Sequence, residues 1–127
     1  MTRSIAQVLE EARSRLKRLG PQEAYEAVRH DGAVLVDTRP QWQRERFGQI
    51  PGALIIERVH LEWRFDPQSE ARLPIADRYD LPIIVFCQEG YSSSLAAAAL
   101  QDLGLHRATD LVGGFAAWRE AGLDFVL

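Results

Sequence analysis

The sequence has very few of the residues that crosslink proteins or hold metal ions. Cys87 is the one cysteine among 127 residues, and the three histidines, His30, His60 and His106, lie far apart. A single thiol excludes an internal disulfide and any zinc site built from several cysteines, and the histidines lack metal-ligand spacing. A chain of this length buries about two-thirds of its unfolded surface, so it can fold without crosslinks. We therefore expect a protein that needs no metal ion and no organic cofactor.

Long apolar runs and an excess of basic residues are missing as well. The longest apolar runs, such as 83–87, are much shorter than the stretch of about 20 residues that a membrane-spanning helix needs. The N-terminal segment has no apolar secretory core, and Glu10 and Glu11 are unlike a transit peptide. The 15 Lys and Arg are outnumbered by 18 Asp and Glu, and no basic run is present for nucleic acid. These absences predict a cytoplasmic protein with no membrane or nucleic-acid partner.

The N-terminal segment has the pattern of an amphipathic helix. Between residues 4 and 19, apolar residues recur at helical spacing, Ser4 can cap the start, and Gly20 with Pro21 ends the pattern. The opposite face is basic, and we expect it to be a solvated face; its residues are Arg13, Arg15, Lys17 and Arg18. We therefore divide the chain into a helical extension, 1–19, and a folded domain, 20–127.

From residue 20 onward, short apolar runs alternate with helical patterns. Strands are predicted at 33–36, 53–56, 83–86 and 109–112. Helices are predicted at 22–28, 41–47, 60–65, 92–103 and 115–121. Runs that are apolar throughout are typical of strands in a parallel sheet that helices cover on both faces. The sequence therefore predicts an α/β fold.

Cys87 stands where an open parallel sheet places its active sites, directly after a strand. The residues that follow lead into a helix, so their backbone N–H groups and the helix dipole can converge in front of the sulfur. Such donors stabilise a thiolate and an anion carried on it. The pattern predicts a nucleophilic cysteine, although a lone cysteine beside a strand can also be a small core residue. The candidate binding loop consists of Gln88, Glu89, Gly90, Tyr91, Ser92 and Ser93.

Four motifs, in this order, resemble those of the rhodanese homology domain. They are residues 34–39, residues 49–53, residues 84–87 with Gly90, and residues 113–115 with Trp118 and Gly122. The resemblance covers the chain from about residue 20 to its end. It implies a three-layer domain in which helices flank a central parallel sheet of about five strands, with the N-terminal helix as an addition.

The resemblance also implies an activity, that of a sulfurtransferase. In this family the cysteine takes a sulfane sulfur from a donor such as thiosulfate or a persulfide and holds it as a persulfide. It then passes the sulfur to a thiophilic acceptor such as cyanide or a thiol. For this chain the carrier would be Cys87, and the partners would be a small-molecule donor and a small-molecule or protein thiol. We expect a monomer or a weak homodimer.

Two of the motifs depart from the family pattern. Many rhodaneses begin the loop Cys-x-x-Gly-x-Arg, and Ser92 stands at the arginine position here, while Glu89 adds an acid to the loop. Gln49 replaces the histidine of the His-Ile-Pro-Gly-Ala motif. Because the loop has no cation to pair with a dianion, we expect modest affinity for thiosulfate.

Charged residues also follow two other predicted strands. Asp37 and Arg39 are expected to form a buried pair that supports the fold. Arg58 follows the second apolar run, and we assign it as a substrate-binding residue that reaches the loop from the side. The alternative is that Arg58 forms a surface ion pair with Glu57 or Glu62.

Two other functions stay open at this point. A rhodanese-like domain can act as a sulfur-relay or protein-docking domain with little turnover. The presence of Cys87 and Gly90 favours catalysis, but the absence of the loop arginine keeps this alternative open. Cysteine phosphatases of a similar fold use a longer loop that ends in arginine. Ser92 and Glu89 make the present loop a poor phosphate site, so phosphatase is a distant third.

Overall fold

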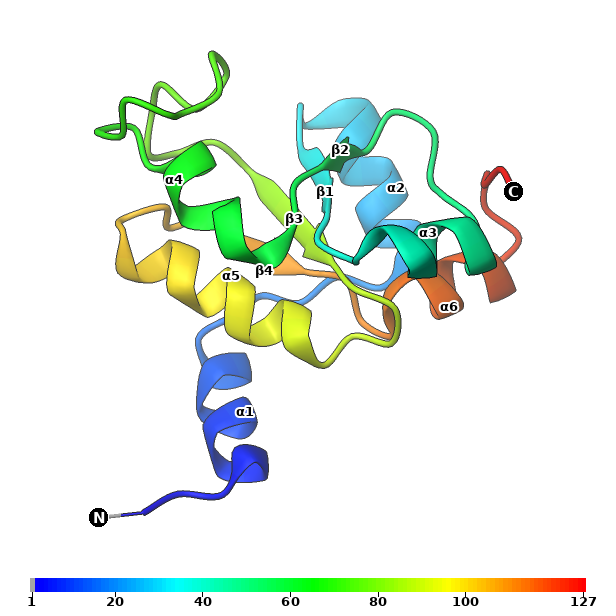
Figure 1. The fold of residues 1–127 in the computed structure, drawn as a ribbon, viewed down its shortest axis with the longest axis horizontal. Helices are drawn as coiled ribbons and strands as arrows, with labels where there is room; N and C mark the ends of the chain where they lie inside the picture. The colour runs from blue at the N-terminus through cyan, green and yellow to red at the C-terminus, as the bar shows by residue number, and fades with distance from the viewer. Residues whose placement is uncertain (1) are drawn as a thin grey trace.

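The computed structural model describes residues 2–127 and places a parallel sheet between two groups of helices, with α1 projecting from the body (Figure 1). No helix in this range is both long and apolar enough to cross a membrane. In chain order the elements are α1 (Ile5–Ser14), α2 (Pro21–His30), β1 (Val34–Asp37), α3 (Gln41–Phe47), β2 (Leu54–Ile55), η1 (Arg58–His60), α4 (Leu61–Phe65), β3 (Ile83–Phe86), α5 (Ser92–Asp102), β4 (Thr109–Asp110) and α6 (Gly114–Glu120).

The sheet has four parallel strands in the order β2-β1-β3-β4. Strands β1 and β3 pair along their whole length, from Val34 opposite Ile83 to Asp37 opposite Phe86. All four residues of β3 are buried, as the continuous apolar run predicts. The α/β fold is confirmed, but four strands form where about five were expected. At the β4 edge, where a fifth strand could pair, the structure has an isolated parallel bridge between Leu19 and Leu111.

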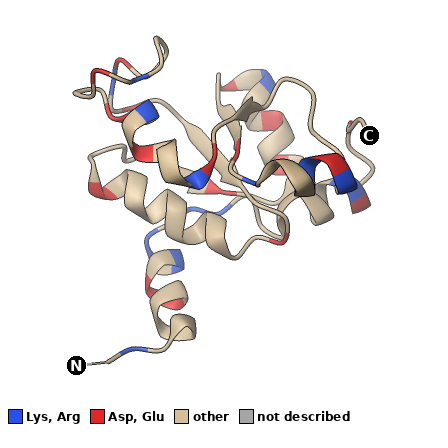
Figure 2. Ribbon diagram, viewed as in Figure 1, with Lys and Arg blue, Asp and Glu red and all other residues tan. Residues whose placement is uncertain are grey.

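Two apolar cores lie on the two faces of the sheet. On one face, Val36, Ile83 and Val85 pack with residues of α4 and α5. On the other face, Leu35, Ile84 and Phe86 pack with residues of α2 and α6. The α5 ribbon carries no charged residue before Asp102, whereas basic and acidic residues alternate on the more exposed α3 and α4 (Figure 2). Ala96, Ala97 and Ala98 of α5 are buried, so the small residues of this helix let it lie close to the sheet.

The N-terminal helix is shorter than predicted. Ser4 caps it as expected, because its Oγ accepts from the Gln7 N–H at 3.1 Å. The prediction that the helix extends to residue 19 is wrong, since α1 ends at Ser14. The chain then runs to the sheet, where the Leu19 N–H donates to the Asp110 carbonyl at 3.1 Å and the Val112 N–H donates to Leu19 at 2.8 Å. Pairing with the open β4 edge overrides the helical spacing of the sequence.

Candidate active site

Cys87 lies at the carboxyl end of β3, inside a loop whose amides face its sulfur. The N–H groups of Gly90 and Ser93 donate to Sγ at 3.2 Å and 3.3 Å. Gly90 has a positive φ of 88°, the left-handed region that favours glycine, so the loop can turn back over the sulfur here. The loop runs directly into α5, so the positive end of that helix dipole adds to the field. The sequence prediction of an amide-lined loop agrees with this geometry.

The surroundings of Cys87 favour its thiolate. Burial by itself raises the pKa of the thiol, but the hydroxyls of Ser93 and Ser92 and the N–H groups of Ser93 and Gly90 outweigh it. The net pKa of Cys87 therefore lies below its ordinary value. The Ser93 hydroxyl has one proton and donates it to Asp110 Oδ2 at 2.8 Å, so we assign the lowering mainly to the fixed amides and to Ser92.

Further donors in the loop stay available for a bound anion. Within residues 2–127, the N–H groups of Glu89, Tyr91 and Ser92 donate to no protein acceptor. Their three side chains are exposed, and Cys87 itself is 7% exposed. Three amide donors of the loop are therefore unused by the described part of the chain. Loops of this kind bind anions through backbone dipoles alone.

Glycines let α6 lie directly against the back of the loop. The N–H groups of Phe115 and Ala116 donate to the carbonyls of Cys87 and Gln88 at 2.9 Å and 3.0 Å. A Cβ atom on Gly114 would overlap the Cys87 carbonyl oxygen and lie 2.8 Å from the Gln88 carbonyl carbon. In the sequence the diglycine is part of a motif of the resemblance, but its contact with the cysteine loop was not predicted.

Arg39 supports the loop from β1. Its guanidinium is buried, donates to Asp37 Oδ2 at 2.8 Å and lies 4.3 Å from the centre of the Phe115 ring. The buried pair with Asp37 that we expected is therefore present. Arg39 also donates to Gln88 Oε1 at 2.8 Å. The Gln88 side chain thus points its oxygen to Arg39, and a role of Gln88 toward substrate stays a prediction.

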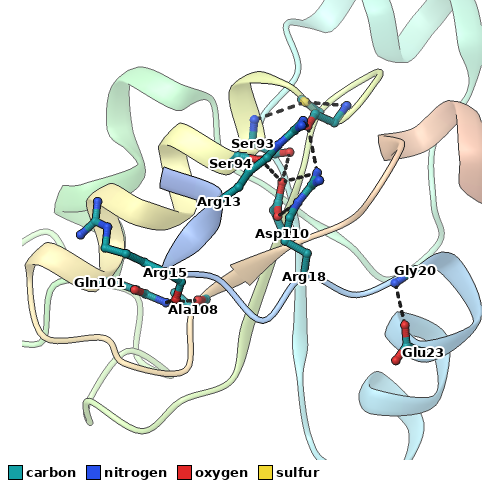
Figure 3. A network of polar contacts seen from close by, with 12 residues as sticks. Arg13, Arg15, Arg18, Gly20, Glu23, Ser93, Ser94, Gln101, Ala108 and Asp110 are labelled. Atoms are coloured by element: carbon teal, nitrogen blue, oxygen red, sulfur yellow. Dashed lines mark hydrogen bonds and ion pairs between the residues drawn. The ribbon is translucent and has the colours of Figure 1, made fainter. Parts of the chain in front are cut away.

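Two of the four basic residues of the N-terminal extension leave the solvated face that we predicted: Arg15 and Lys17 are exposed, but Arg13 and Arg18 are partly buried. Arg13 and Arg18 both donate to the Gly90 carbonyl of the cysteine loop, at 2.8 Å and 3.1 Å. Figure 3 shows these two side chains converging with Ser93, Ser94 and Asp110 beneath the loop. The sequence carries no local signal for these contacts, because 72 or more positions separate the arginines from their partners.

Arg58 makes a different contact from the one we assigned. Its Nη1 donates to Glu62 Oε1 at 2.6 Å, one helical turn away, and the side chain is partly exposed. Among residues 2–127, no hydrogen bond or ion pair joins Arg58 to the loop. The surface-pair alternative therefore describes this structure, and a role of Arg58 toward substrate stays a prediction.

A cleft opens beside the loop. It has a volume of about 590 Å³, and Gln88 and Glu89 form one wall. Trp42, Phe47 and Phe115 supply apolar surface, and Trp42 is 57% exposed. A group approaching the cysteine loop from this side would meet aromatic side chains before it reached the loop amides.

The fold and the loop together define an α/β protein whose thiol lies in an amide-lined loop at the end of a parallel strand and has a lowered pKa. The sequence model of the rhodanese-like domain matches residues 20–121. Thiosulfate sulfurtransferase GlpE of Pseudomonas fluorescens is 38% identical over 106 residues, which cover 84% of this chain and 87% of that protein. GlpE of Ectopseudomonas mendocina is 39% identical with the same coverage. The chain therefore belongs to the rhodanese-like family, as a rhodanese-type sulfurtransferase, and the resemblance found in its motifs is confirmed.

Solved structures agree with this assignment of the fold. A protein of unknown function from Rhodopseudomonas palustris, named a possible tyrosine phosphatase, is 37% identical with a TM-score of 0.87. That match covers 98% of this chain and 96% of the other, so it includes α1, which the family match from residue 20 leaves out. The human single-domain sulfurtransferase TSTD1 is 26% identical, with a TM-score of 0.67 over 81% of this chain and 95% of that one.

A lowered pKa of Cys87 predicts how its reactivity depends on pH. The rate of alkylation by iodoacetamide should rise with pH to a midpoint below that of a free thiol, because the folded loop stabilises the thiolate. Glu89→Gln should move the midpoint down slightly, since it removes a like charge whose exposed carboxylate is screened by water. A midpoint at or above that of free cysteine would indicate an inert buried thiol instead.

Proposed function

We propose that this enzyme carries a sulfane sulfur on Cys87 from thiosulfate or a persulfide donor to cyanide or a thiol. The observation that carries the proposal is the pair of amide donors, from Gly90 and Ser93, on the Sγ atom. They stabilise the attacking thiolate, and the free amides of the same loop supply donors for a second sulfur. The relatives named as thiosulfate sulfurtransferases support the donor class. A reduced single cysteine suits a cytoplasmic enzyme.

The reaction consists of two displacements at sulfur. The Cys87 thiolate attacks the outer sulfur of thiosulfate, so the bond from Sγ to that sulfur forms and the bond to the sulfonate breaks. The electron pair leaves with sulfite, and the enzyme holds a persulfide anion. Cyanide or a thiolate then attacks the outer sulfur, which leaves as thiocyanate or a new persulfide and returns the Cys87 thiolate. No proton, oxidant or reductant is needed in either step.

Intact mass is the direct test. Incubation with thiosulfate or a persulfide donor should add the mass of one sulfur atom to the chain, because Cys87 is its one thiol. Cyanide or dithiothreitol should remove the added mass. A chain that stays unmodified with both donor types would contradict the proposal and favour the protein-docking alternative.

The preference of the enzyme for thiosulfate over a persulfide donor should increase when a cation is added to the loop. Ser92→Arg places a guanidinium at the start of α5, and we expect it to lower the KM for thiosulfate about tenfold through a charge-assisted bond to the dianion. The KM for an uncharged persulfide donor should change much less. Steady-state kinetics with both donors provide the measurement, and an equal effect on both would mean that charge is not the cause.

Arg58→Ala is the companion variant in that experiment. If Arg58 leaves Glu62 to contact a bound dianion, the KM for thiosulfate should rise selectively. Unchanged kinetics would show that the ion pair with Glu62 is the whole role of Arg58.

The name of the R. palustris protein makes phosphatase the second activity to test. A phosphate ester in this loop would find amides but no loop arginine, and it would meet the carboxylate of Glu89. We expect no hydrolysis of p-nitrophenyl phosphate above the rate of the chain alkylated at Cys87. Hydrolysis that alkylation abolishes would assign the loop to phosphate instead.

In this proposal a thiol acceptor reaches the loop through the cleft beside it. Trp42 and Phe47 offer apolar contact next to Glu89, which suits a thiol carried on a larger molecule better than cyanide. A thiol-bearing protein is therefore a proposed acceptor, together with small thiols.

A further inference from the structure

The Gly90 carbonyl is held by two guanidinium groups from outside the rhodanese-like domain. Arg13, in α1, donates to it through Nη2 at 2.8 Å, and Arg18, in the segment before α2, donates at 3.1 Å. The Arg13 guanidinium also lies 5.6 Å from the centre of the Tyr91 ring. Both arginines are partly buried. A loop of the domain is thus fixed by a segment that lies before the family match begins.

A buried carboxylate joins these arginines to the loop. Asp110, at the end of β4, is fully buried and accepts from Arg18 Nε at 2.8 Å. The hydroxyls of Ser93 and Ser94 each donate to Asp110 Oδ2 at 2.8 Å, and Arg13 Nε donates to Ser94 Oγ at 3.1 Å. Figure 3 shows this network as one connected group under the loop. Two arginines and one aspartate leave one positive charge beside the sulfur-binding amides.

The orientation of one peptide plane connects this network to the sulfur. In a planar trans peptide, C=O and N–H point in opposite directions. When the arginines hold the Gly90 carbonyl, the Tyr91 N–H must point away from them, and this N–H is one of the amides left without a protein acceptor. Gly90 itself donates its N–H to Sγ at 3.2 Å. A change in the hold on the Gly90 carbonyl therefore turns the Tyr91 N–H directly, and it reaches the Gly90 N–H, which belongs to the preceding peptide plane, through the Gly90 Cα atom.

We propose that Arg13 and Arg18 are positioning residues of the sulfur-transfer loop, and that they supply from behind the positive charge that the loop lacks at Ser92. This inference rests on the proposed function and explains how a loop with Glu89 and no arginine can still bind an anionic donor. It also gives the N-terminal extension a role in catalysis, consistent with its presence in the R. palustris structure. Arg13 and Arg18 act through the Gly90 peptide and their charge, and they touch no reacting atom.

Arg13 is the better residue to change. Removing Arg18 would leave the Asp110 carboxylate buried without its cation, which destabilises the fold for reasons unrelated to the loop. Arg13→Met keeps much of the side-chain length and removes the charge and the donors. Arg15→Met is the matched control, since Arg15 lies two positions away but pairs with the exposed Asp102 at 2.6 Å. Arg13→Lys restores the charge with fewer fixed donors.

The readouts are the pH midpoint of alkylation and the kinetics of thiosulfate. The charged groups around the loop are Glu89, Asp110, Arg13, Arg18, the pair of Arg39 with Asp37, and Arg119 and Glu120 of α6 beside the cleft. We expect Arg13→Met to raise the midpoint by about half a pH unit, about threefold in the thiolate equilibrium. The KM for thiosulfate should rise about threefold with a smaller change in kcat. Arg13→Lys should recover most of both effects, and Arg15→Met should leave both unchanged.

Each outcome decides the matter. If Arg13→Met and Arg15→Met share the same midpoint and the same KM, Arg13 only covers the loop and the inference is wrong. If Arg13→Met also lowers the melting temperature, the melting temperature of Arg13→Lys is measured beside its alkylation midpoint. Recovery of the midpoint in Arg13→Lys supports a positioning role. Absence of that recovery contradicts it. Alkylation requires no sulfur transfer, so it tests the arginines even if the wild-type chain forms no persulfide, a result that would overturn the proposed function alone.

Discussion

Cys87→Ser is expected to abolish both the sulfur adduct and turnover. The side chain changes by one atom, but a serine hydroxyl is not ionised near neutral pH, whereas the loop lowers the pKa of the thiol. No second thiol exists to carry the sulfur. We expect thiocyanate formation from thiosulfate and cyanide to fall at least about 10³-fold, to the rate without enzyme. Intact mass should show no added sulfur.

The fold of this variant should be intact, which makes the loss interpretable. The Gly90 and Ser93 amides that face Sγ can donate to a hydroxyl oxygen in the same position. Thermal unfolding of the variant should therefore stay close to that of the wild-type chain. A folded serine variant with normal sulfur transfer would rule out Cys87 as the carrier and with it the proposed mechanism.

The placement of Cys87 in an amide-lined loop was predictable because its signals are local. A four-residue apolar run from Ile83 predicts a buried parallel strand, and such strands end at the edge where ligands bind. Cys87 follows directly, and the helix that begins at Ser92 orients the loop amides toward it. Each of these features depends on neighbours within a few residues, so the sequence pattern contains them.

The parts that were not predictable depend on distant partners. Arg13 and Ser94 are 81 positions apart, and nothing near Arg13 distinguishes it from Arg15, which pairs at the surface. The end of α1 at Ser14 has the same origin, since Leu19 is drawn to the open edge beside Leu111. Helical spacing can show where an apolar stripe lies but not whether the charged stripe opposite meets solvent or another segment.

Arg58 is a residue for which the local sequence pattern and the comparison with the family predicted different contacts. Its spacing to Glu62 is that of an i, i+4 pair on a helix, and the structure has that pair at 2.6 Å. We assigned Arg58 to substrate binding because the loop lacks an arginine, and a positively charged residue is expected near an anionic donor. In our proposal the arginines of the extension meet that need from behind the loop, and the Arg58→Ala variant tests whether Arg58 contributes to it as well.

Gly114→Ala is expected to damage the site without touching its chemistry. Gly114 has a positive φ of 61°, and its position faces the backbone of the cysteine loop rather than a flexible side chain. A methyl group there would overlap the Cys87 carbonyl oxygen, so either α6 or the loop must move. Strain at positive φ together with overpacking should cost about 3 kcal/mol of unfolding free energy. For a domain of this size, that lowers the melting temperature by about 10 °C.

Gly122→Ala separates the two parts of this effect. Gly122 has a comparable φ of 79°, but a Cβ atom there would meet nothing within 4 Å. It should therefore carry only the conformational cost, about 1 kcal/mol. The pH midpoint of Cys87 alkylation should rise in Gly114→Ala, because the displaced loop aims its amides less well at Sγ, and should stay unchanged in Gly122→Ala. Equal losses of stability and equal midpoints in the two variants would show that α6 can retreat freely, and that the diglycine does not set the shape of the loop.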